Sequence, residues 1–245
     1  MFWGTVSGVR ADEIDDYQRS FDAYRQAYSV FEVDQADYTK TQTFAAEEAL
    51  INSAREMLLF RADSWLNYWK TLAARYATVA SAADESRSNW KSFFEAENIW
   101  LTEHKTGLTQ QKARKGLLEE TNKLNNLKEG YSIKAYQMNV EIISGKMKDA
   151  IIQVREVNEV LLDKAKAQQM SPDQQETIIR GLTANIERLN QLEADAVVVR
   201  QDFINQSGFA DEGEFTSISQ DFSPLYQQLR QLTSITRELA KDIQW

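Results

Sequence analysis

The feature that most constrains this chain is the near absence of residues that end a helix. No Gly or Pro occurs between Phe44 and Gly107, and the chain of 245 residues holds only 9 Gly and 2 Pro. Sheet proteins of this size usually need many turns that contain Gly or Pro, so the pattern favours helices. Apolar residues make up 42% of the chain, which argues against disorder. We therefore expect an all-α fold.

Apolar side chains recur at alternating steps of three and four residues, which places them on one stripe of a helix. The first such stripe is aromatic and typical of a coiled-coil seam: Tyr17, Phe21, Tyr24, Tyr28 and Phe31. The stretch from Thr39 to Thr43 is rich in Thr, which weakens helix propensity, so the helix can continue, kink or break there.

From Phe44 the same spacing continues to His104, and we expect one long helix that ends at a cationic turn closed by Gly107. A second long helix should run from Thr109 to about Gln169, because no Pro interrupts it. Ser171-Pro172 is typical of a helix start, and the new helix should end near Ser207-Gly208. A connector over 208–222 should then precede a last helix that begins at Ser223-Pro224.

These helix lengths predict a single elongated domain over residues 1–245, an antiparallel bundle of about four helices. Its body should comprise residues 11–80, 136–169, 172–207 and 223–245. Residues 81–135 should form a projecting two-helix coiled-coil hairpin, with its tip near 104–109. Gly116, Gly130 and Gly145 share one face of the second long helix, where we expect close packing against Trp90 or Trp69.

Several function classes are disfavoured by composition. The net charge of -9 disfavours nucleic acid and makes membrane contact possible but not favoured. The chain has no Cys and a lone His, and residue 101 is Leu, so no Glu-x-x-His pair of a di-iron bundle exists at His104. No phosphate-binding loop or dinucleotide fingerprint occurs. We expect no enzyme activity, no cofactor and no metal.

Two surfaces are candidates for binding a partner. The predicted hairpin tip combines apolar and cationic side chains in an acidic protein, which suggests docking: Trp100, Leu101, His104, Lys105, Leu108, Lys112, Arg114 and Lys115. The simpler interpretation is that Trp100 and Leu101 seal the last turns against Leu108. Large aromatic residues at the chain ends are the second candidate, as contacts or as covers of the core: Phe2, Trp3 and Trp245.

The leading functional hypothesis is a non-catalytic structural or interaction protein, a helical scaffold or surface-assembly subunit that binds a protein partner or itself. An alternative is a sensor or binding domain for a small apolar ligand, with Trp65, Trp69 and Tyr76 lining a cavity. A membrane-associated helical rod is a third possibility, although a rod of that kind needs a broad basic face.

The run Tyr38-Thr39-Lys40-Thr41-Gln42-Thr43, followed by Glu48-Ala49-Leu50 and Met57-Leu58-Leu59, Arg61 and Tyr68, resembles a pattern in uncharacterised, predicted exported long-helix proteins of bacteria. The resemblance covers about a fifth of the chain and contains no catalytic motif. It implies an envelope or extracellular setting, with a natural leader removed, and no particular activity.

Overall fold

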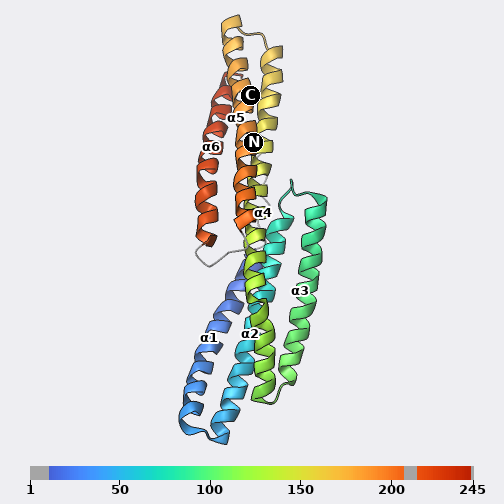
Figure 1. Ribbon diagram of the computed structural model, residues 1–245. Coiled ribbons are helices and arrows are strands. Elements are labelled where there is room, and N and C mark those ends of the chain that lie inside the picture. The colour runs from blue at the N-terminus through green and yellow to red at the C-terminus, as the bar shows by residue number, and fades with distance from the viewer. Residues whose placement is uncertain (1–10, 207–213, 244–245) are drawn as a thin grey trace. The chain divides into compact units, whose positions relative to one another are not determined.

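The computed structural model describes residues 11–206 and 214–243 of the chain. Within these residues the secondary structure consists of six helices and no strand, which confirms the all-α prediction but not the count of about four (Figure 1). The helices are α1 (Ala11–Thr41), α2 (Phe44–Ala77), α3 (Asp84–Gln110), α4 (Arg114–Ala167), α5 (Pro172–Gln206) and α6 (Glu214–Asp242). No helix of this part of the chain is long and apolar enough to cross a membrane.

The break between α1 and α2 lies in the Thr-rich stretch where the sequence left three alternatives open. Gln42 adopts a left-handed backbone conformation with φ of 50°, which turns the chain out of α1. Thr43 then caps α2, because its hydroxyl oxygen accepts a hydrogen bond from the Ala46 N–H at 3.2 Å. The helix therefore breaks here without Gly or Pro.

The single helix expected from Phe44 to His104 is wrong, since the chain leaves α2 after Ala77 and enters α3 at Asp84. Tertiary hydrogen bonds hold this break: the Asp149 carboxylate accepts the N–H groups of Ala80 and Ser81 at 2.8 and 2.7 Å. These bonds satisfy backbone donors that a continuous helix would have satisfied internally. No local residue type marks the position.

The hairpin turn also lies further along the chain than predicted. Gly107 is helical, α3 continues to Gln110, and the connection to α4 spans residues 111–113 instead of 104–109. α6 likewise begins at Glu214, nine residues before the expected start at Ser223, and contains Pro224. Phe222, which is fully buried in the core, anchors the turn that precedes this proline.

The chain divides into two compact units. Of the described residues, the first unit contains 11–78 together with Ala82–Tyr131, and the second contains Val79–Ser81 together with 132–206 and 214–243. The predicted stalk over 81–135 is therefore not a free two-helix hairpin. Leu108 and Leu117 share a core cluster with Ala27 of α1 and with Met57 and Leu58 of α2, so α3 and the start of α4 complete a helical bundle in the first unit.

The second unit has a core of its own, in which α4, α5 and α6 each contribute apolar side chains. At its centre a polar cluster links the three helices. The Asn158 and Asn185 amide groups both donate to the Thr236 hydroxyl oxygen, at 2.8 and 2.9 Å. Asn185 is only 1% exposed, and a buried polar residue on an apolar stripe of this kind fixes the register of neighbouring helices.

Candidate functional site

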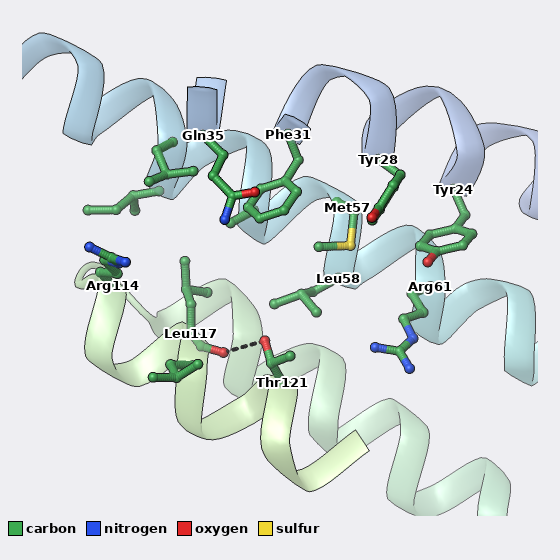
Figure 2. Close-up of a pocket in the computed structure, with 14 residues that line it drawn as sticks. Tyr24, Tyr28, Phe31, Gln35, Met57, Leu58, Arg61, Arg114, Leu117 and Thr121 are labelled. Carbon is green, nitrogen blue, oxygen red and sulfur yellow. Dashed lines mark hydrogen bonds between the residues drawn. The ribbon is translucent and has the colours of Figure 1, made fainter. Parts of the chain in front are cut away.

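An open groove in the first unit is the candidate functional site. Side chains of α1, α2 and α4 line it, and it encloses a volume of about 330 Å³ (Figure 2). The lining residues are Tyr24, Tyr28, Phe31 and Gln35 from α1, Leu50, Ile51, Ala54, Met57, Leu58 and Arg61 from α2, and Arg114, Leu117, Leu118 and Thr121 from α4. Ten of these fourteen are apolar or aromatic, so the groove offers mainly apolar surface.

Helical spacing explains why these residues face one another. Tyr24, Tyr28, Phe31 and Gln35 follow steps of four, three and four, so they share one stripe of α1. The turn at Gln42 folds α1 back along α2. The Arg55 side chain of α2 donates from Nε and Nη2 to the Gln111 carbonyl, at 3.0 and 2.7 Å, which fixes the chain just before α4 against α2.

An aromatic row on α1 borders the groove. Tyr17, Phe21, Tyr24, Tyr28 and Phe31 contact one another in sequence, with ring centres 6.0 to 6.3 Å apart. The sequence predicts these residues as a coiled-coil seam, yet Phe21 and Tyr28 remain 40% and 41% exposed. On the α4 side of the groove Leu118 is 59% exposed. Both edges of the groove therefore present apolar surface that this unit does not cover.

The predicted tip residues fall into two groups, and the first of these is packed inside the unit. Leu101 and Leu108 have no exposed surface, and His104 is 5% exposed. Trp100 stacks on the His104 ring with centres 4.9 Å apart, and His104 Nδ1 lies 3.0 Å from a Glu120 carboxylate oxygen without hydrogen-bond geometry. Burial lowers the pKa of His104 below its ordinary value, and the Glu120 carboxylate opposes that shift.

The second group is cationic and lies at the surface. Lys105 forms an ion pair with Asp63 at 2.5 Å, and Lys115 lies 4.0 Å from Glu119. Lys112 and Arg114 are exposed, and Arg114 also lines the groove. The structure thus does not assemble the eight tip residues into one docking surface. Phe2, Trp3 and Trp245 lie outside the described residues.

Trp65, Trp69 and Tyr76, the suggested cavity lining, contribute to core packing. Trp69 is 2% exposed, and its ring packs edge-on against Phe93 and Tyr131 with centres 5.1 and 5.3 Å apart. Trp65 packs on the same Tyr131 ring at 4.9 Å. Buried Tyr131 donates its hydroxyl hydrogen bond to Glu97, and burial together with this carboxylate raises the pKa of Tyr131.

Sequence reasoning identified the aromatic stripe on α1 but missed the groove beside it. Arg61, Leu118 and Thr121 carried no distinguishing signal, because a charged or apolar residue at a helical position is usually a solvated or core residue. Their common site arises where three separate helices meet.

No group of metal-ligating side chains competes with the groove in the described ranges. Among residues 11–206 and 214–243, no three or more His, Asp or Glu side chains are placed to hold a metal ion. Comparison of the chain with protein-family models, curated proteins and solved structures gives no significant match. We therefore infer function from the geometry and chemistry of the groove.

Proposed function

We propose that this chain is a non-catalytic interaction protein that binds an amphipathic helix of a partner protein in the groove between α1, α2 and α4. The observation that supports this most is the uncovered apolar surface on both edges, represented by Tyr28 and Leu118. An amphipathic helix recognises such a groove through apolar side chains at positions i, i+3, i+4 and i+7. Extended exposed apolar surface on a soluble domain commonly marks an interaction site.

The dimensions of the groove suit a helix. Its α2 floor extends from Leu50 to Arg61, which at 1.5 Å per residue is about 16 Å, or about three helical turns. Its volume of about 330 Å³ would accommodate a few large aliphatic side chains. A small ligand is usually enclosed over most of its surface, whereas here both edges stay exposed. We therefore favour a helix over a small apolar molecule.

The test begins with a display library of helical peptides that have a constant polar face and a randomised apolar face. Peptides selected on the intact protein are measured by fluorescence anisotropy against Leu118→Asp and Val198→Asp. These two residues are a matched pair, because each is 59% exposed, but Val198 belongs to α5 in the second unit. We expect Leu118→Asp to weaken binding at least about tenfold, which is about 1.4 kcal/mol, and Val198→Asp to leave it unchanged.

Two outcomes contradict the proposal. One is a failure to select any helix, and the other is equal binding of selected helices to the wild-type protein and to Leu118→Asp. Light scattering over a range of concentrations provides a second check. If the protein forms dimers that Leu118→Asp dissociates, the occupant of the groove is a second copy of this chain and not a separate partner.

A further inference from the structure

Two arginines are the only charged side chains among the residues that line the groove. Figure 2 shows them at opposite ends, Arg114 beside Gln35 and Arg61 below Tyr24. Arg61 is half-buried and Arg114 is exposed. The chain as a whole has 37 acidic and 28 basic residues, so a groove lined by cations and no carboxylate differs from the average surface of this protein.

Neither guanidinium group is neutralised within the described part of the chain. Arg61 Nη1 donates to the Asn125 side-chain oxygen at 2.9 Å, a neutral partner. The Arg114 guanidinium lies over the Tyr38 ring, 5.5 Å from its centre. No Asp or Glu of residues 11–206 or 214–243 forms an ion pair with either one. Both groups retain N–H donors that suit a carboxylate.

We infer that the partner helix carries two acidic side chains about three turns apart, one at each end of its apolar stripe, which pair with Arg61 and Arg114. This inference rests on the proposed function. The ends of the groove are about 16 Å apart along α2, and that distance corresponds to about eleven residues of a bound helix. Residues i and i+11 differ by only about 20° around a helix, so both carboxylates and the apolar stripe between them face the groove.

The two pairs would select the partner more than they would raise its affinity. Ion pairs at the edge of an interface contribute little free energy because solvent screens them, but they fix register and reject like charges. The exposed apolar side chains on the two edges, Tyr28 and Leu118, would supply the affinity, since burying apolar surface is the dominant favourable term in association. An apolar helix with lysines at both ends should therefore be excluded.

The experiment uses four synthetic helical peptides with one apolar stripe taken from the selected binders. Their paired end positions carry Glu at i and i+11, Glu at i and i+7, Gln at i and i+11, or Lys at i and i+11. Binding to the wild-type protein should be tightest for Glu at i and i+11, by about twofold to fivefold per pair over the Gln peptide. This preference should shrink as salt is raised.

Variants of the two arginines supply the control. In Arg61→Gln/Arg114→Gln the Glu and Gln peptides should bind equally, and in Arg61→Glu/Arg114→Glu the Lys peptide should become the tightest. Far-UV circular dichroism checks that these variants remain folded. The variants should do so, because neither arginine has an ion pair in the described part of the fold.

The outcomes separate this inference from the proposed function. If the Gln peptide binds the wild-type protein as tightly as the Glu peptide, the acidic pattern is wrong while helix binding stands. If no peptide binds whatever its charge, the proposed function itself fails. If a long-chain dicarboxylic acid binds more tightly than every helix, the occupant is a small amphiphile, and both the helix and its acidic pattern are overturned.

Discussion

Replacing Gly145 by Ala tests how α4 packs against Val79, in the segment that follows α2. A Cβ atom added at Gly145 would lie 2.3 Å from Val79 Cγ1, whereas ordinary contacts begin near 3.4 Å. Val79 is 1% exposed and cannot turn toward solvent. Its segment is also held by Asp149 and by the Ser81 hydroxyl, which donates to the Gly145 carbonyl at 3.2 Å. The new methyl group must therefore displace Val79, although hydrogen bonds hold the residues that follow it in place.

The magnitude follows from two opposing terms. Overpacking a core by a methyl group costs about 1 to 3 kcal/mol, and replacing an interior helical Gly by Ala gains about 1 kcal/mol. Gly145→Ala should therefore destabilise the protein by about 0 to 2 kcal/mol. Gly130 is also interior to α4, but no atom lies within 4 Å of an added Cβ. Gly130→Ala should therefore stabilise by about 1 kcal/mol.

Urea unfolding followed by far-UV circular dichroism measures both free energies, and a double-mutant cycle isolates the contact. In a Val79→Ala background the obstructing methyl groups are gone, so Gly145→Ala should gain its full helix propensity of about 1 kcal/mol. If Gly145→Ala stabilises the wild-type protein as much as Gly130→Ala does, Val79 does not pack on Gly145 and the reasoning is refuted.

Two further predictions concern buried polar groups. Burial lowers the folded-state pKa of His104 below its unfolded value of about 6.5, so its contribution to stability is fully present above about pH 6.5 and is lost as the pH falls through the folded-state pKa. Because His104 is the lone histidine, it should cause most of the change in the urea unfolding midpoint with pH between about pH 7.5 and 5.5. The midpoint of His104→Gln should therefore change much less over this range. A pH dependence equal to that of the wild-type protein would show that other groups cause it. Thr236→Val removes the hydroxyl that accepts hydrogen bonds from Asn158 and Asn185, and should cost about 1 to 3 kcal/mol in urea unfolding, whereas stability equal to wild type would show that the cluster is not buried as described.

The expected packing of three glycines illustrates where pattern reasoning stops. The sequence predicts that Gly116, Gly130 and Gly145 admit a close neighbour such as Trp90 or Trp69. Gly145 does admit one, but it is Val79, and an added Cβ at Gly116 would meet the Gln111 side chain. Gly130 faces open space. A shared helical face therefore does not imply a shared environment, because the neighbours come from segments distant in sequence.

Local chemistry was enough for the fold class and for the clearest boundary. The rarity of Gly and Pro and the alternation of apolar residues determined an all-α protein, and Ser171-Pro172 correctly marked the start of α5. The Ser171 hydroxyl oxygen accepts from the Gln174 N–H at 3.3 Å, as its position predicts. Such signals are readable because capping and periodicity involve residues a few positions apart.

Tertiary structure alone decided the break after Ala77, the continuation of α3 through Gly107 and the groove itself. The Asp149 carboxylate of α4 accepts the hydrogen bonds that hold the break after Ala77. The Glu120 side chain, also from α4, approaches Gly107. The stripe on α1 indicated that Tyr24 and Phe31 face a neighbour, but not that Tyr28 and Leu118 would stay exposed on the two edges of a groove that two arginines also line. Whether an apolar stripe is covered depends on which helices pack on it. The packing of the helices is determined by the total apolar surface that the unit buries, and the spacing of residues within one stripe does not reveal it.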